Sequence, residues 1–470
     1  MDDEKVPKGD SDTMKIENAA DESPYTPEEE KKLLRSIDMI LMPTIFIMYL
    51  LSYMDRTNIG NAKIAGMEDD LNMSSGQYSI CLVVFFIGYV VFEVPSNMVL
   101  SKTRPSIFLP AIMVLWGTLT CLMAVVKTYK HVLILRVLIG CIEAGFAPGV
   151  LLIISSWYKR SEQSKRFAVY ISAAILSGAF GGLLAAAIVE GLEGAHGLRG
   201  WRWLFIVEGA VTIFFAIVSS FILLDFPDTS KKFTARQRFV AVSRLQSEDV
   251  VSLDKNVPRM ASLEALQRAL TDWRTWMFTV GYMVIVGSST LTYFYPTLVQ
   301  GLGYTTTKSA NYMTVPIYGS AFVCTAVSGY FGDKVPQWRG VIIAAWLTFS
   351  MICAIVVCAV YDFTARYVLL VLMASGLWAT NAAALSYSSS SIGDMPPEVR
   401  GISLAVINGL ANLAQIYGSY LFPSSDEPKY IRGFSAIAAM LFLGVATYIL
   451  LHICVRRRNR RLLNTGALEE

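Results

Sequence analysis

Charged residues are scarce in this sequence. Only 16% of its 470 residues are Asp, Glu, Lys or Arg, and 54% are hydrophobic. A soluble globular domain carries about 25% charged residues, so this composition excludes an ordinary water-soluble domain. The formal net charge is only +3, which says little about partners, and no nucleic-acid partner is expected.

Metal-binding and disulfide patterns are also missing. The seven cysteines fall within or at the edges of apolar stretches, and none forms a Cys-x-x-Cys pair, so we expect reduced, buried thiols. The three histidines lack the i, i+4 spacing of a helical metal site. We therefore expect no metal ion and no cofactor. Because the apolar stretches contain no nucleophile–base pair, we do not expect an enzyme.

Long apolar runs dominate what is present. Each is about 20 residues long, enough to cross a bilayer as a helix. The sequence therefore predicts an all-α membrane protein with twelve transmembrane helices in two six-helix bundles. The predicted spans are 37–56, 77–99, 106–126, 131–155, 167–190, 202–224, 274–299, 309–331, 340–361, 366–388, 400–421 and 433–455.

Polar segments divide the chain into parts. Residues 1–30 read as a disordered acidic tail, without the apolar core of a cleavable signal peptide. Thr26, Pro27 and Glu29 have the pattern of a helix start, from which we expect a short surface helix. The stretch 225–273 is predicted to be a linker between two bundles, which resemble each other as parallel repeats. The predicted parts are 31–224 for the first bundle, 274–456 for the second, and 457–470 for a basic tail.

Lys and Arg near the span ends predict the orientation. They are enriched at 31–35, 159–166 and 456–461, which places both termini and the linker in the cytoplasm by the positive-inside rule. A glycosylation sequon at Asn72 would then face outward, and whether it is glycosylated is left open.

Ionisable residues inside the predicted spans are unevenly distributed. Such residues cost about 2.5–3.5 kcal/mol each at the centre of a membrane helix and usually serve a function. The first half has Asp55, Arg56, Glu93, Arg136, Glu143, Glu190 and Glu208. The second half offers neutral hydrogen-bonding groups instead, namely Tyr293, Tyr295, Asn381, Asn408, Asn412 and Gln415.

Arg136 and Glu143 are seven residues apart, which places them on one helical face. They form either a structural ion pair or a charged relay, in which Glu143 pairs with Arg136 until it is protonated. Asp55 and Arg56 end the first apolar run. They either mark the outer surface or, if the helix continues, lie inside the protein, where the planar guanidinium of Arg56 suits a carboxylate.

Two further groups indicate gating or structural roles. Glu93 lies just before Pro95 near the cytoplasmic end of the second span. The stretch GYFGDKVPQWRG is expected to be the loop after the eighth span, in which a glycine closes the helix and the charged residues form a latch. The residues concerned are Gly329, Asp333, Lys334 and Arg339.

Several motifs resemble the major facilitator superfamily. The stretch Gly329 to Arg339 is similar to its G-xxx-D-[RK] loop, and Arg136-xxx-Gly140 to its fourth-helix motif. The segments DRTNIGNAKI, RVLIGCIEAGFAPG, GWRWLFIVEG and FPSSDEPKYIRG narrow the resemblance to the anion:cation symporter family, and within it to the fungal allantoate permease-like branch. The first-half loop NMVLSKTRPS departs from the motif because it lacks the Asp, and Ser389 and Ser390 stand where amides are common.

This resemblance implies roles for individual residues. Arg56 corresponds to the arginine that holds the substrate carboxylate, and Asp55 and Glu143 to protonatable acids. Arg136 corresponds to the fourth-helix partner that modulates Glu143. We therefore expect proton coupling at Asp55, Arg136 and Glu143. The expected substrate-binding residues are Arg56, Asn58, Tyr89, Tyr293, Asn408 and Gln415.

The function expected from the resemblance is proton-coupled symport of a small organic anion by alternating access. The partners are then a carboxylate such as a vitamin or a nitrogen-source acid, protons and the lipid bilayer, and the protein works as a monomer. The expected location is the plasma membrane, with a vacuolar or other internal membrane as the alternative. An exporter of an organic acid and a non-transporting nutrient sensor on the same fold remain open.

Overall fold

A computed structural model describes residues 25–100, 103–246, 262–304, 306–393 and 395–464, and every regular element in these residues is a helix. Eleven of the helices are long and apolar enough to cross a membrane, and they coincide with eleven predicted spans. The remaining predicted span, 309–331, forms α15 (Val315–Lys334), which packs between α8 and α17. Its many Gly, Ser and Thr residues make it less apolar than the others. The predicted all-α membrane fold is confirmed.

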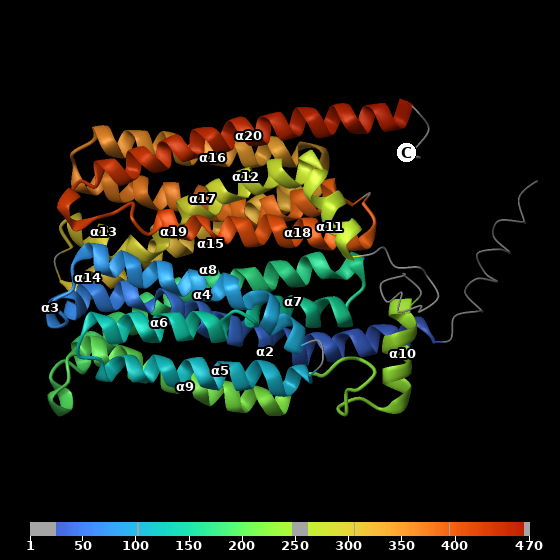
Figure 1. Cartoon of the computed structure of the whole chain (residues 1–470), viewed down its shortest axis with the longest axis horizontal. Coiled ribbons are helices and arrows are strands. Elements are labelled where there is room, and N and C mark those ends of the chain that lie inside the picture. Colours follow the sequence, from blue (N-terminus) through green and yellow to red (C-terminus); the bar gives the residue numbers. More distant parts are fainter. Residues whose placement is uncertain (1–24, 101–102, 247–261, 305, 394, 465–470) are drawn as a thin grey trace, which may run out of the picture.

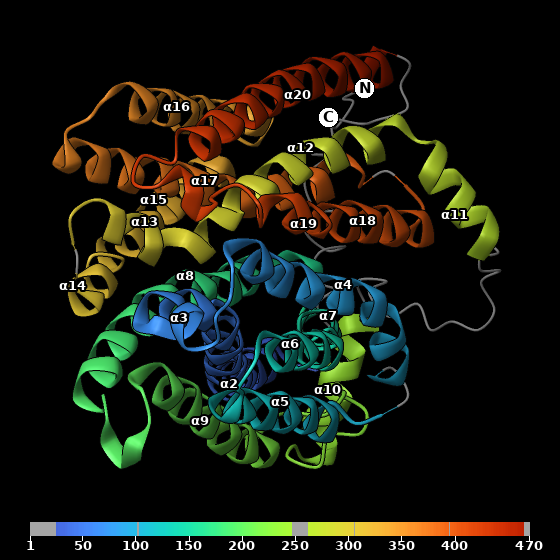
Figure 2. The same cartoon turned by 60° about the vertical axis from the view of Figure 1, so that its left-hand side comes forward.

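The helices run along the long axis of the molecule and form two bundles that lie side by side across it (Figure 1). In the end view, α2 lies inside the first bundle, with the other helices around it (Figure 2). The first bundle contains α2 (Pro27–Ala62), α4 (Ser75–Leu100), α5 (Pro105–Leu122), α6 (Tyr129–Glu143), α7 (Phe146–Trp157), α8 (Arg160–Gly191) and α9 (Gly200–Ile222). The second contains α12 (Trp273–Ser289), α13 (Tyr295–Gly301), α14 (Thr307–Tyr312), α15, α16 (Arg339–Ala359), α17 (Phe363–Ser391), α18 (Pro397–Asn412), α19 (Ala414–Gly418) and α20 (Ile431–Asn464).

The first helix begins where the sequence indicates. The Thr26 side chain accepts a hydrogen bond from the Glu29 backbone at 3.2 Å, and the Glu29 carboxylate accepts one from the Thr26 backbone at 3.0 Å. This reciprocal capping satisfies two backbone donors that a helix start leaves open. The helix expected to lead into the first span is continuous with that span, because α2 runs through all 36 residues from Pro27 to Ala62.

Several of the predicted spans are interrupted, among them the eighth, which is divided between α14 and α15. The fourth is divided into α6 and α7 after Glu143, where Pro148 has no N–H to donate to the carbonyl of Ala144. The seventh is divided by a 3₁₀ segment, Thr290–Phe294, which precedes Pro296. The eleventh is divided between α18 and α19. Broken helices expose backbone polar groups near the middle of a membrane protein, which is where transporters place their sites.

The linker is divided between the two bundles. Helix α10 (Ala235–Gln246) packs against the first bundle through the buried side chains of Val240, Ala241 and Leu245. Helix α11 (Ser262–Thr271) instead packs on α18 of the second bundle. Figure 1 shows α10 and α11 at the same end of the molecule. Each linker helix is therefore expected to move with its own bundle.

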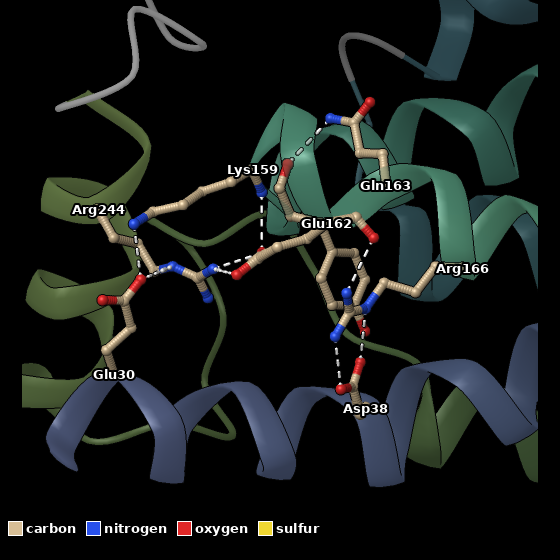
Figure 3. A network of polar contacts seen from close by, with 8 residues as sticks. Glu30, Asp38, Lys159, Glu162, Gln163, Arg166 and Arg244 are labelled. Atoms are coloured by element: carbon tan, nitrogen blue, oxygen red, sulfur yellow. Dashed lines mark hydrogen bonds and ion pairs between the residues drawn. The ribbon is translucent and has the colours of Figure 1, made fainter. Parts of the chain in front are cut away.

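A charged network joins α10 to the ends of α2 and α8 (Figure 3). The Arg244 guanidinium is fully buried and contacts the carboxylates of Glu162 and Glu30. Lys159 also pairs with Glu30, at 2.7 Å. Burial lowers the pKa of Lys159, but the hydrogen bond and charge of Glu30 more than offset this, so that the pKa lies above its ordinary value.

A second ion pair in the same network ties α8 to α2. Arg166 donates two parallel hydrogen bonds to Asp38, at 2.9 and 2.7 Å. The Arg166 guanidinium also lies 4.3 Å from the ring centre of Tyr158. Bidentate pairs of this kind fix geometry as well as adding energy, so α2, α8 and α10 are held together at this end.

The buried arginine of α10 predicts a difference in stability. Replacing Arg244 with Ala leaves Glu162 without its cation and leaves Glu30 with Lys159 alone, and breaking a buried pair costs about 3–5 kcal/mol of unfolding free energy. Arg236 on the same helix makes an exposed pair with Glu29, so Arg236→Ala is the matched control and should change little. Thermal unfolding of both purified variants measures the difference. Equal losses would contradict a special role for the buried pair.

Candidate functional site

Glu143 and Arg56 form a buried ion pair at the centre of the first bundle. Arg56 Nη2 lies 2.7 Å from Glu143 Oε1, and the side chains are 13% and 1% exposed. The Ser52 hydroxyl donates to the same oxygen at 2.7 Å. Ser52 and Arg56 are one helical turn apart on α2, and Glu143 is the last residue of α6. The break after Glu143 therefore presents its carboxylate to the face of α2.

Arg136 does not have the partner that the sequence suggested. The expected pairing of Glu143 with Arg136 is wrong, because Glu143 pairs with Arg56 instead. Arg136 is 3% exposed, and its Nε and Nη2 atoms have no hydrogen-bond partner in the described residues. Its guanidinium lies 5.6 Å from the ring centre of Phe85. Arg136 is on the same helix as Glu143, but its side chain lies against Phe85.

Aromatic rings surround the Arg56 guanidinium. The ring centres of Tyr89, Phe85 and Tyr53 lie 4.9, 5.3 and 5.7 Å from its central carbon. Tyr53 also contacts Trp378 of the second bundle, with ring centres 6.1 Å apart. Cation–π contacts strengthen where water is excluded. The three rings therefore hold the guanidinium in place and leave some of its N–H groups available for hydrogen bonds to a ligand.

Asp55 lies beside Arg56 in sequence but is directed elsewhere. Its Oδ2 accepts hydrogen bonds from Trp116 Nε1 at 3.1 Å and from the Thr212 hydroxyl at 2.8 Å. The residue is 6% exposed, and α2 continues past it to Ala62. Of the two alternatives for Asp55 and Arg56, the structure supports the continuing helix over a pair at the outer surface.

The second-half residues lie at or near the helix breaks. Tyr293 is in the 3₁₀ segment, with its ring 5.9 Å from that of Phe86 in the first bundle. Gln415 is half-buried in α19, and its Oε1 has no hydrogen-bond partner among the residues that the structure describes. Asn408 is half-buried in α18. Asn58 of the first bundle is fully buried, and neither atom of its amide has a partner in the described residues. These four residues keep their substrate-binding assignment as a prediction.

The expected loop after the eighth span is wrong in its boundaries. Helix α15 continues through Gly329 to Lys334, so Gly329 does not close the helix. The Lys334 ammonium lies 4.6 Å from the ring centre of Tyr330, and Arg339 begins α16 and donates from Nε to the Gly332 carbonyl at 3.0 Å. Asp333 is in the last turn of α15. Glu93 is half-buried in α4, and the gating roles remain predictions.

Several residues that contact Arg56, Glu143 or Asp55 were not assigned a role from the sequence, namely Tyr53, Phe85, Ser52, Trp116 and Thr212. Ser52 could have been found, because it lies four residues before Arg56 and so on the same face of the helix. Trp116 and Thr212 come from other helices, and nothing in their sequence surroundings indicates the contact with Asp55. Glu208 is noticeable only as a charge inside an apolar span.

Two helical bundles that meet around broken helices are typical of membrane transporters. The sequence model of the Major Facilitator Superfamily matches residues 45–419. The chain belongs to this superfamily, and it is a multi-pass membrane transporter of that type.

Individual relatives agree with this assignment. The chain is 33% identical over 464 residues to the MFS transporter prlL of a fungal species (strain NRRL 50135), covering 95% of this chain and 91% of the relative. It is 27% identical to the high-affinity nicotinic acid transporter of Saccharomyces cerevisiae, covering 92% of this chain and 79% of the relative. A crystal structure of a bacterial homolog of the human lysosomal transporter Spinster, inward-facing and unoccupied, shares the fold with a TM-score of 0.70 at 16% identity. That match covers 92% of this chain and 98% of the other.

Contacts between the bundles gather at the end opposite to α10. Lys308 pairs with Glu190, Thr307 donates to the Ile64 carbonyl at 3.1 Å, and Ser75 contacts Ser424. Gly60 of α2 lies so close to the other bundle that a Cβ atom there would be 2.7 Å from the Tyr293 carbonyl oxygen. The bundles are therefore in contact at this end, which the sequence predicts to face outward.

The close approach at Gly60 predicts a shift between conformations. Gly60→Val forces α2 away from the Tyr293 backbone and should open the outer end. The matched control is Gly319→Ala, because no atom lies within 4 Å of a Cβ placed there. Spin labels on Cys at positions 191 and 312, in a background without native cysteines, report the distance between bundles. We expect a longer distance in Gly60→Val only, and an unchanged distance would contradict the role of this contact.

Proposed function

We propose that the protein is a proton-coupled symporter of a small organic anion, a carboxylate, that works by alternating access. The observation that carries this proposal is the ion pair of Arg56 with Glu143, in which one carboxylate already occupies the arginine. The Arg56 side chain remains 13% exposed. A carboxylate on the substrate would bind the same guanidinium. A carboxylate that enters a buried site loses its bound water, and the two parallel hydrogen bonds from an arginine are the strongest replacement for that water.

Competition for one arginine links the substrate to a proton. An ionised Glu143 and an ionised substrate cannot both neutralise Arg56 without leaving a net negative charge in a buried site, which is costly. A proton on Glu143 removes its charge and frees the arginine. The protonated carboxyl can then turn to the Ser52 hydroxyl, which lies 2.7 Å away. Substrate anion and proton would therefore occupy the first bundle together.

The relatives support an anionic substrate. The nicotinic acid transporter covers most of the chain, and nicotinic acid is a small carboxylic acid that is ionised at neutral pH. We assign the chain to the fungal allantoate permease-like branch of the anion:cation symporter family, on the segments that resemble it. We further propose that it acts as a monomer in the plasma membrane.

In an alternating-access cycle, the outer end is closed in one state and open in another. The contacts around Gly60, Ile64 and Ser75 would separate to admit substrate from outside. The network that holds α10 to the first bundle lies at the opposite end and would move with that bundle. The bundles then rock about the helix breaks that surround the Arg56 site.

Arg56 provides the direct test of substrate recognition. Lys keeps the charge but loses the planar fork, and a hydrogen bond to a charged group contributes about 1.5–3 kcal/mol. We expect Arg56→Lys to raise the Michaelis constant about tenfold to a hundredfold and Arg56→Ala to abolish uptake. Uptake of a panel of radiolabelled carboxylates, beginning with nicotinate, in cells without their own carriers provides the measurement.

The control for these variants is Arg268→Ala, which removes an exposed arginine of α11 that pairs with Glu264 one turn away. It should take up substrate as the unmodified protein does. Amide analogues of the substrate should compete poorly, because they lack the charge. A preferred substrate that is neutral or cationic, or unchanged kinetics in Arg56→Ala, would overturn the organic-anion proposal.

A further inference from the structure

Lys63 is a buried cation that the Arg56 site does not use. It follows α2 directly as the first residue of a short π-helical segment, Lys63–Met67, and it is 7% exposed. Its ammonium pairs with Glu68 Oε1 at 3.6 Å, which is longer than a hydrogen bond. That oxygen is buried and has no hydrogen-bond partner in the described residues. A buried ion pair with such geometry gains little against the cost of losing water, so stability alone does not explain Lys63.

Lys63 lies on the same face of the first helix as Arg56. The two residues are seven apart, so Lys63 is about two turns, or about 10 Å, nearer to the end that is predicted to face outward. Helix α4 repeats this spacing with rings. The Lys63 ammonium lies 4.6 Å from the ring centre of Tyr78. The Arg56 guanidinium lies 5.3 Å from that of Phe85, seven residues further along α4, and Arg136 lies against the same ring. These contacts form one cationic strip from the outer end to the Arg56 site.

The second bundle covers the outer part of this strip. The ring centre of Phe294 lies 5.9 Å from the Lys63 ammonium and 6.2 Å from the ring centre of Tyr78. The Tyr78 hydroxyl is buried there without a hydrogen-bond partner in the part of the chain that the structure describes. Glu427, in the loop before α20, is a second carboxylate near Lys63, and it accepts a hydrogen bond from Tyr430 at 2.7 Å. Separation of the bundles at this end would therefore uncover a cation and a phenol that can both donate to an anion.

We propose that Lys63 and the Tyr78 hydroxyl form an outer anion-binding subsite, where the carboxylate of the substrate binds before it reaches Arg56. The incoming carboxylate displaces Glu68 from the Lys63 ammonium and accepts a hydrogen bond from the phenol. The positive charges of Lys63, Arg136 and Arg56 then favour movement of an anion inward along the strip. This inference rests on the proposed function, because it assigns a first binding step to the same carboxylate substrate.

Glu68 allows a binding subsite to be distinguished from a structural ion pair. Lys63→Gln removes the cation and should raise the Michaelis constant for carboxylate uptake about tenfold, the lower end of the effect of charge on association. Glu68→Gln removes the anion that competes with the substrate and should lower that constant by a similar factor. A structural pair predicts a change in the same direction for both variants, because each loses the same contact.

Uptake of the radiolabelled carboxylate by cells that express the full chain gives both constants, with the amount of protein in the membrane measured in parallel. The matched control is Lys130→Gln, which removes an exposed lysine at the same end, in the first turn of α6, and should leave the constant unchanged. A Michaelis constant that does not rise in Lys63→Gln, or does not fall in Glu68→Gln, would overturn the proposal.

Tyr78→Phe provides a second test if the charge variants do not reach the membrane. It keeps the ring against Lys63 and removes only the unpartnered hydroxyl, so the protein should fold normally and the Michaelis constant should rise. An unchanged constant would contradict the subsite. Loss of the dependence on Arg56 would count against the proposed function. Normal kinetics in the Lys63 and Tyr78 variants, with Arg56 still required, would count against this subsite alone.

Discussion

The ion pair between Arg56 and Glu143 is the interaction on which the other features of the site depend. Both side chains are almost completely removed from water, so neither charge is stable there without the other. Ser52 adds a donor and three aromatic rings surround the guanidinium. A pair of this kind is sensitive to one proton, because neutralising Glu143 leaves a buried cation that needs another anion. The proposed transport cycle follows from that need.

Helix breaks place these groups at the middle of the molecule. Glu143 ends α6 directly before a break that Pro148 explains, and Tyr293 lies in the 3₁₀ segment before Pro296. Continuous helices such as α2 supply the opposing faces and extend to the ends of the bundle. At one end, α10 is fixed to α2 and α8 by a charged network, and at the other end Gly60 allows a close approach of the bundles. The charged network and the close contact between the bundles are thus at opposite ends.

The sequence predicted the all-α membrane fold because apolar length is a strong signal, and eleven of the twelve predicted spans coincide with helices long and apolar enough to cross a membrane. It also drew attention to Arg56, Asp55 and Glu143, since charges are rare in membrane helices, and the structure places Arg56 against Glu143 and buries Asp55. It failed on the partner of Glu143, because spacing along α6 places Arg136 on the same face but does not reveal the neighbouring helix. Trp116 and Thr212 were missed for the same reason, as contacts between helices distant in sequence leave no local pattern. The loop expected at Gly329 is helical, because glycine alone does not end a helix.

In the proposed cycle, a carboxylate substrate and a proton reach the site together because the substrate and an ionised Glu143 compete for Arg56. Calorimetric titration of the purified protein with its carboxylate substrate, in buffers that differ in ionisation enthalpy, measures the protons taken up for each molecule bound. At neutral pH we expect proton uptake by the unmodified protein and its loss in Glu143→Gln, with binding of the carboxylate retained. Binding without proton uptake by the unmodified protein, or equal uptake by Glu143→Gln, would contradict it.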